Sequence, residues 1–226
     1  MKVVVYAICK NERAFADRWM ASMSEADEVY VLDTGSTDGT PQRLEELGAH
    51  VTVETITPWR FDVARNRSLD LVPADADLCV CTDLDEVFQP GWREKVEEAW
   101  TPGVDRLLYR YTWNFLPDGR EGMVYWYDKM HRRWGCRWVN PVHEVLQFEG
   151  ESPKTAMWRG CTWNTTRIRT RAAASTSPCW NWRWRKTRRT TATSTTWGGS
   201  TSSTAGGRRA SPCSNATWPC PPPPGR

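Results

Sequence analysis

Acidic side chains are absent from the last part of this 226-residue chain, because no Asp or Glu follows residue 151. Residues 159–226 carry 12 of the 30 Lys and Arg residues, so residues 1–158 hold 18 of them beside all 27 acids. The overall charge of +3 therefore combines a first part of net charge −9 with a basic second part. An acidic body argues against a nucleic-acid-binding face on it.

Long apolar runs and cysteine motifs are also missing. No run approaches the roughly 18 residues that a membrane span needs, and the opening MKVVVYAICKNERAF becomes charged too soon for a signal peptide. The eight cysteines form no C-x-x-C pair, which gives no support to a zinc site or a disulfide framework. We therefore expect a cytoplasmic protein, with peripheral contact at the inner face of the cell membrane as an alternative.

Residues 159–226 contain no Leu, Val, Phe, Tyr, Met, His or Gln, and end in PCPPPPGR. Such a composition cannot bury enough apolar surface to offset the entropy of ordering, which predicts a disordered tail. Read one base out of frame with GC-rich codons, however, the Trp- and Arg-rich stretch can decode to an acidic sequence with helical periodicity. We therefore expect an incomplete folded domain over residues 1–158 and an out-of-frame low-complexity tail over residues 159–226. The frame would change near residues 152–161, and independent clones with an identical tail would contradict this hypothesis.

Apolar runs typical of buried strands alternate with amphipathic segments typical of helices. The expected strands cover residues 2–10, 27–33 and 50–56, and a fourth strand runs into a loop within residues 76–88. The expected helices cover residues 11–26, 39–49, 61–72 and 90–100. Thr40 is the expected N-cap of the second helix, with Pro41 at its first position. Residues 105–115 and 122–134 then alternate aromatic and polar positions around a PDG turn, as an antiparallel pair would.

This order predicts an α/β fold with a mostly parallel sheet, flanking helices and a small antiparallel extension. Ligands of such sheets bind beyond the carboxyl ends of the strands. Asp33 ends the second expected strand, and Asp83, Asp85 and Glu86 follow the fourth. We therefore expect these carboxylates to meet one ligand. The alternative for Asp33 is that it only caps the turn that follows it.

Four segments, VVYAICKNE, VLDTGSTDGT, WRFDVARNRSLDLV and CTDLDEVFQPGW, occur in this order over about residues 3–95. Together they resemble family 2 glycosyltransferases of the GT-A fold, and the full set is specific where a lone D-x-D is weak. The resemblance implies transfer of a sugar from a nucleotide-diphosphate sugar to an acceptor hydroxyl. UDP-sugars are the first candidates for the donor. It also implies Mn²⁺ or Mg²⁺ and an inverting reaction, in polysaccharide or lipid-linked glycan assembly. The acceptor, whether glycan, lipid-linked or protein, is not specified, and the family's usual continuation is missing.

The resemblance also implies roles for individual residues. Asp85 is the expected direct metal ligand, Asp83 faces the ribose or the metal, and His143 is a late metal ligand. Glu144 and Glu86 are the two candidates for the general base. The predicted donor-binding residues are Ile8, Asn11, Glu12, Asp33, Gly35, Ser36, Asp38, Arg65 and Asp83.

Structural alternatives exist for several of these residues. Arg65 could form a surface salt bridge, His143 could pack in a turn on Trp138, and Glu144 could be solvated. The aromatic positions of residues 109–134 could line an acceptor site or simply pack between strands.

Two other functions compete with glycosyl transfer. A nucleotidyltransferase would place a Gly-rich phosphate loop after the first strand, where this chain reads AICKNERAF without glycine. An inactive, truncated nucleotide-binding domain would keep the family's sequence without turnover.

Overall fold

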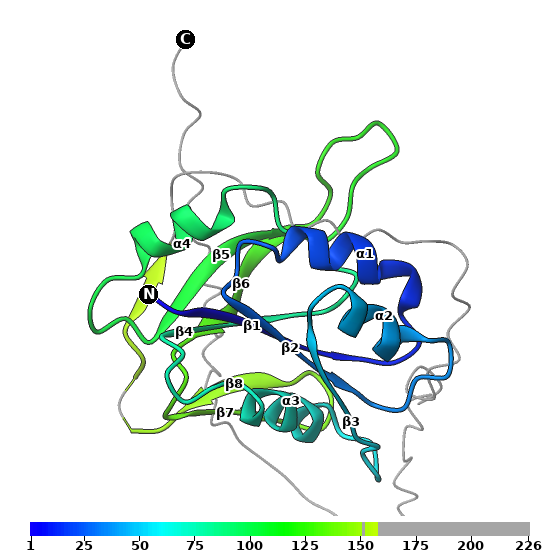
Figure 1. The fold of residues 1–226 in the computed structure, drawn as a ribbon. Helices are drawn as coiled ribbons and strands as arrows, with labels where there is room; N and C mark the ends of the chain where they lie inside the picture. Colours follow the sequence, from blue (N-terminus) through cyan, green and yellow to red (C-terminus); the bar gives the residue numbers. More distant parts are fainter. Residues whose placement is uncertain (151, 158–226) are drawn as a thin grey trace, which may run out of the picture. The chain divides into compact units, whose positions relative to one another are not determined.

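The computed structural model describes residues 1–150 and 152–157. Within them, a seven-stranded sheet has the order β3-β2-β1-β4-β6-β5-β9, and β7 and β8 form a separate pair (Figure 1). The strands are β1 (Val3–Cys9), β2 (Glu28–Asp33), β3 (His50–Val53), β4 (Leu78–Thr82), β5 (Arg106–Thr112), β6 (Val124–His131), β7 (Cys136–Val139), β8 (Val145–Phe148) and β9 (Thr155–Met157). The helices are α1 (Arg13–Ser22), α2 (Thr40–Glu46), α3 (Phe61–Asp70) and α4 (Trp92–Ala99). The tail predicted over residues 159–226 lies outside the described residues.

The parallel half of the sheet is built around β1, which pairs in parallel with β2 and β4. Val3, Val5 and Ala7 belong to a core shared with α1, α2 and α4, whereas Val4 and Tyr6 belong to a core shared with α3 and the β7–β8 pair (Figure 1). A parallel strand covered on both faces is apolar throughout, which explains why VVVYAIC lacks polar alternation. The predicted α/β class with a mostly parallel sheet is confirmed.

The later strands extend this sheet in the antiparallel sense. β6 runs antiparallel to β4, with Val80 opposite Met130, and β5 runs antiparallel to β6. Tyr109 and Tyr111 are buried in the core that α1 and α4 share. The packing interpretation therefore holds for these two aromatic residues. The register sets His131, the last residue of β6, opposite Cys79, so Lys129 lies further toward the carboxyl end of β4, where the acidic loop begins.

A chain of buried hydrogen bonds connects β1 to β6 and β7. The indole N–H of Trp138 donates to the Tyr6 hydroxyl at 2.8 Å, and that hydroxyl lies 2.7 Å from Nε2 of His131. Nδ1 of His131 lies 2.7 Å from the carbonyl oxygen of Arg132. Because an indole only donates and a carbonyl only accepts, the proton of His131 sits on Nδ1 and the Tyr6 hydroxyl donates to Nε2. This assignment corresponds to the neutral imidazole, which burial favours by lowering the pKa of His131.

We expect His131 to make stability depend on pH. Burial, helped by the charge of Arg133 and opposed by the hydrogen bond to the Arg132 carbonyl, lowers the pKa of His131 to about 4. An unfolded histidine titrates near 6.5, so the unfolded chain binds the extra proton between these values. The contribution is fully present above about pH 6.5 and is lost as the pH falls toward 4, by roughly 3 kcal/mol.

Urea denaturation of the wild type and of His131→Gln at several pH values measures this contribution. The advantage of the wild type over the variant should shrink by roughly 3 kcal/mol between pH 7 and pH 4. Both proteins contain the same carboxylates, so the effect of carboxylate titration on stability cancels in this difference. Parallel stability curves would show that His131 does not titrate differently in the folded state.

Candidate functional site

The loop after β2 is folded around Asp33, which is fully buried. One carboxylate oxygen accepts the backbone N–H groups of Gly35 at 2.9 Å and Ser36 at 2.7 Å. The other accepts the Ser36 hydroxyl at 2.5 Å and the Cys9 thiol at 3.3 Å. Gly35 has a φ of +103°, a conformation that glycine adopts without strain. Asp33 therefore does cap its own loop, and its contact with a nucleotide base stays a prediction.

The loops after β1 and β2 are joined by side-chain hydrogen bonds. The side-chain amide oxygen of Asn11 accepts the backbone N–H of Thr37 at 2.8 Å, and the backbone N–H of Asn11 donates to the Ser36 hydroxyl at 2.7 Å. Asn11 itself has a φ of 56°. The structure thus brings the predicted donor residues Asn11, Gly35 and Ser36 together at the carboxyl ends of β1 and β2.

Asp38 holds the beginning of α2. Its carboxylate accepts the backbone N–H groups of Thr40 at 3.0 Å and Arg13 at 3.2 Å. Burial alone would raise the pKa of Asp38. The hydrogen bonds from the Thr40 hydroxyl and from these two N–H groups outweigh burial, so the pKa lies below its ordinary value. The expected N-cap at Thr40 is wrong, because Gly39 precedes the helix with a φ of 83° and Thr40 is its first residue. The Thr40 hydroxyl instead accepts the backbone N–H of Glu12 at 2.9 Å.

Ile8, the remaining predicted donor residue of β1, is only 8% exposed. Its side chain packs with Leu32 and Ala64 in a small cluster between β1, β2 and α3. The Ile8 side chain therefore belongs to the core and stabilises the end of β1 by packing.

Replacing Asp33 separates its two roles. Asp33→Ala should lower the free energy of unfolding by about 1–3 kcal/mol, because the loop N–H groups lose their acceptor. Asp33→Asn retains a carbonyl oxygen for these N–H groups, so its stability should change less. If Asp33 also accepts from a nucleotide base, both variants should lose UDP affinity in calorimetric titrations. Unchanged affinity in Asp33→Asn would leave Asp33 as a loop cap only.

Arg65 of α3 lies at the centre of a buried ionic cluster. Its side chain is 3% exposed; it donates to Asp83 at 2.5 Å and to Glu144 at 3.2 Å. The guanidinium also lies over the ring of Trp138, 5.9 Å from a ring centroid. The surface salt bridge considered for Arg65 is therefore wrong: Arg65 is buried and joins α3 to the loop after β4 and to the chain before β8.

Lys129 of β6 is the second buried cation of the cluster. Its Nζ donates to Asp83 at 3.0 Å and to Glu86 at 3.5 Å. Glu86 also accepts the Tyr111 hydroxyl at 3.1 Å and the backbone N–H of Asp83 at 3.1 Å. Asp83 thus lies between two cations. Glu86 stabilises the loop by bonding the backbone of Asp83 and the hydroxyl of Tyr111.

The two carboxyls of this cluster shift in opposite directions. Desolvation raises the pKa of Asp83, but the charges of Arg65 and Lys129 hold it well below its usual range. Burial raises the pKa of Glu86, and the charge of Asp83 raises it further while Lys129 opposes this. Asp83 is therefore ionised, and the neighbouring Glu86 binds its proton more tightly than an ordinary glutamate does.

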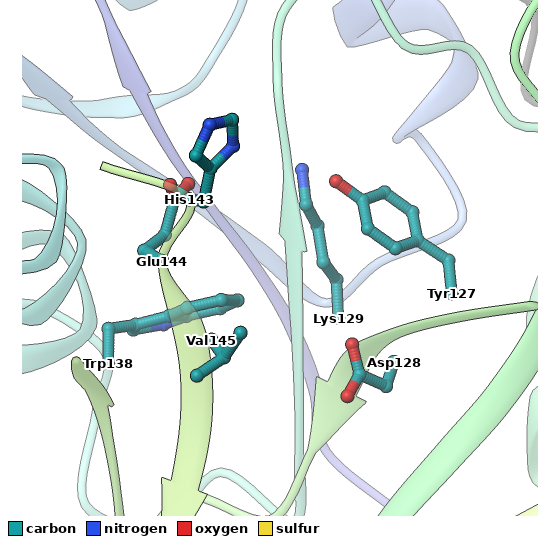
Figure 2. A pocket seen from close by; sticks show the side chains of 7 residues that line it. All are labelled: Tyr127, Asp128, Lys129, Trp138, His143, Glu144 and Val145. Carbon is teal, nitrogen blue, oxygen red and sulfur yellow. The ribbon is translucent and has the colours of Figure 1, made fainter. Parts of the chain in front are cut away.

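The cluster borders a pocket of about 300 Å³. Figure 2 shows His143 and Glu144 on one side of it, with Lys129 and Tyr127 on the other. His143 is exposed and has a φ of 57°. The residues that line the pocket are Tyr127, Asp128, Lys129, Trp138, His143, Glu144 and Val145. Both residues expected at this end of the site therefore face the pocket.

The predicted metal ligands do not form a closed site. Within residues 1–150 and 152–157, no three His, Cys, Asp or Glu side chains gather closely enough to hold a metal ion. Asp83 faces Arg65 and Lys129 instead, while Asp85 is half-buried further along the same loop. A metal at this position would need further oxygen ligands from elsewhere.

Sequence reasoning missed Lys129. It lies in YWYDKMH, where Tyr125, Tyr127 and Lys129 share one face of the strand by their spacing. A lysine on an otherwise aromatic face was the available signal, but its acidic partners come from the distant loop after β4.

Three similar proteins cover different parts of the chain. A TPR repeat-containing protein of Synechococcus elongatus is 29% identical over 181 residues, covering 74% of this chain and 41% of its own length. An uncharacterized glycosyltransferase of Rickettsia bellii is 32% identical over 109 residues, covering 47% of this chain and 36% of its own. The S. aureus TarS fragment 1–349 has a similar structure with a TM-score of 0.51 at 13% identity, covering 74% of this chain and 60% of the fragment.

This chain spans 41% and 36% of the lengths of the two relatives. The likeness to TarS shows the fold alone, and agrees with the GT-A-type α/β sheet predicted from the sequence. The glycosyl transferase family 2 model matches residues 4–164, which include both loops and the buried cluster. The chain belongs to glycosyl transferase family 2.

Proposed function

We propose that this chain transfers a sugar from a nucleoside-diphosphate sugar, with UDP-sugars first, to an acceptor hydroxyl with inversion. The observation that carries the proposal is the edge of the sheet where β2 and β4 end. There the loop folded around Asp33 lies two strands from Asp83, which two buried cations flank. Carboxyl edges of parallel strands are where such sheets bind their ligands.

A divalent cation fits the residues present only if the donor completes its coordination. Mg²⁺ is commonly held by one or two carboxylates together with substrate phosphates. Asp85, in the loop after β4, would supply a carboxylate, and Asp83 in the same loop and His143 at the pocket would assist it. Bound there, Mn²⁺ or Mg²⁺ would stabilise the negative charge of the leaving diphosphate.

The geometry favours Glu144 over Glu86 as the general base. Glu144 lines the open pocket, where an acceptor hydroxyl could approach it. Glu86 is 3% exposed and already accepts from Tyr111 and from the backbone of Asp83. We therefore assign proton abstraction to Glu144 and a bracing role to Glu86.

The proposed location is the cytoplasm or the inner face of the cell membrane. The described part of the chain contains no helix that is both long and apolar enough to cross a membrane.

Hydrolysis of a panel of UDP-, GDP- and other nucleotide sugars by the full chain with Mn²⁺ tests the proposal. Turnover of one donor, lost in Glu144→Gln and retained in Val142→Ala on the exposed turn nearby, is the expected result. Tight binding of a nucleotide without any turnover would favour the non-catalytic alternative. Absence of both binding and turnover would contradict the proposal.

A further inference from the structure

The ammonium of Lys129 combines deep burial with access to the pocket. Its side chain is 4% exposed, and Nζ lies 4.6 Å from the centroid of the Tyr127 ring. Two of its contacts are Asp83 at 3.0 Å and Glu86 at 3.5 Å. Figure 2 shows the Lys129 side chain on the side of the pocket opposite His143 and Glu144.

Burial of this charge calls for a functional explanation. Removing an ammonium from water costs several kcal/mol, and apolar residues can replace a buried ion pair without loss of stability. An ammonium has three N–H donors, and the longer of its two carboxylate contacts is a weak one. The remaining capacity of Lys129 can therefore serve an anionic oxygen that enters the pocket.

The order of the strands indicates which anion this is. Asp33 lies at the end of β2, Asp83 follows β4, and Lys129 lies on β6 beside the end of β4. Neighbouring strands are about 4.8 Å apart, so these residues follow one another along a single edge. A nucleotide whose base lies at β2 would extend its phosphates toward β4 and β6.

We propose that Lys129 binds the diphosphate of the donor and supplies positive charge to the leaving group independently of the metal. This inference rests on the proposed function, because it assumes a nucleoside-diphosphate ligand. It assigns the diphosphate two sources of positive charge: the cation at Asp85 and the protein's own ammonium. Nucleotide affinity should therefore have a component that survives chelation of the metal.

Calorimetric titration of the full chain with UDP and with uridine, both in EDTA, tests this component. Lys129→Met should lower UDP affinity by about tenfold to 100-fold, the range for a hydrogen bond to a charged group, and leave uridine affinity unchanged. Lys129→Arg should retain UDP binding. Lys154→Met is the matched control, because it removes an exposed lysine whose Nζ donates to the Pro102 carbonyl oxygen at 3.3 Å.

Glu86→Gln tests the same inference in the opposite direction. It keeps the inference testable if Lys129→Met does not fold. The amide keeps the size of the side chain and can still accept from the Asp83 N–H, but it no longer neutralises Lys129. UDP affinity in EDTA should rise, and uridine affinity should stay the same. Equal or lower UDP affinity in this variant would overturn the inference, as would equal losses of UDP and uridine in Lys129→Met.

The wild type distinguishes this inference from the proposed function. UDP binding that requires Mn²⁺ and disappears in EDTA would overturn the role of Lys129 and leave the proposed function in place. Absence of UDP binding in both conditions, with no other nucleoside diphosphate bound, would overturn both.

Discussion

Arg65→Met is expected to lower the free energy of unfolding by about 3–5 kcal/mol, because it removes one partner from a buried ionic cluster. Asp83 would keep only Lys129, and Glu144 would lose the guanidinium that lies 3.2 Å away. Folded domains have about 5–15 kcal/mol of stability in total, so this is a large share. Urea denaturation measures the loss directly.

Arg67→Met is the matched control on the same helix. Arg67 is 52% exposed and pairs with Glu54 at 2.9 Å on the surface. Exposed ion pairs contribute about 0–1 kcal/mol, so this variant should remain close to the wild type. Similar losses in the two variants would mean that the cluster around Arg65 adds nothing to stability beyond a surface pair.

Asp85→Asn is expected to lower the Mn²⁺-dependent part of UDP affinity by a factor on the order of 100. Replacing a residue that only hydrogen-bonds to a metal ligand typically lowers metal affinity about tenfold to 100-fold, so replacing a ligand itself should have at least this effect. A neutral amide is a poorer ligand for a hard cation than a carboxylate. Calorimetry with UDP at saturating Mn²⁺ and in EDTA gives the two affinities whose ratio is the quantity of interest.

Asp128→Asn controls for the loss of negative charge beside the pocket. Asp128 lines the same pocket and pairs with Arg106 at 3.3 Å, away from the loop after β4. The ratio of affinities should change in Asp85→Asn alone. An unchanged ratio in Asp85→Asn would remove Asp85 from the metal site, and equal changes in both variants would indicate a general effect of charge.

The sequence allowed the sheet and its ligand-binding edge to be predicted. Strands buried on both faces are continuous apolar runs, and carboxyl ends of parallel strands share one edge. This placed Asp33 and Asp83 at the same edge of the sheet, two strands apart, before any contact was known. The GT-A-type class and the family followed from motifs in the same loops.

The ionic cluster could not be predicted in the same way. Asp83 was assigned to the ribose or the metal, and its pairing with Arg65 and Lys129 depends on the register between β4 and β6. No local pattern encodes that register, since β6 lies more than forty residues further along the chain. The cap of α2 was misplaced for a related reason: the Thr40 hydroxyl accepts the N–H of Glu12, which lies 28 residues earlier, while Asp38 accepts the N–H of Thr40.

The hydrogen bonds from Tyr6 to His131 and from Trp138 to Tyr6 join residues 125 and 132 positions apart. Contacts of such long sequence separation are formed late and slow the folding of a domain, because the loop between them must close first. On the ribosome, the Tyr6 hydroxyl of the first strand lacks both of these partners until His131 and then Trp138 have left the exit tunnel. The protein must therefore complete this core after nearly the whole body has been synthesised, and a growing chain exposes the unfinished face of β1 to chaperones throughout that time.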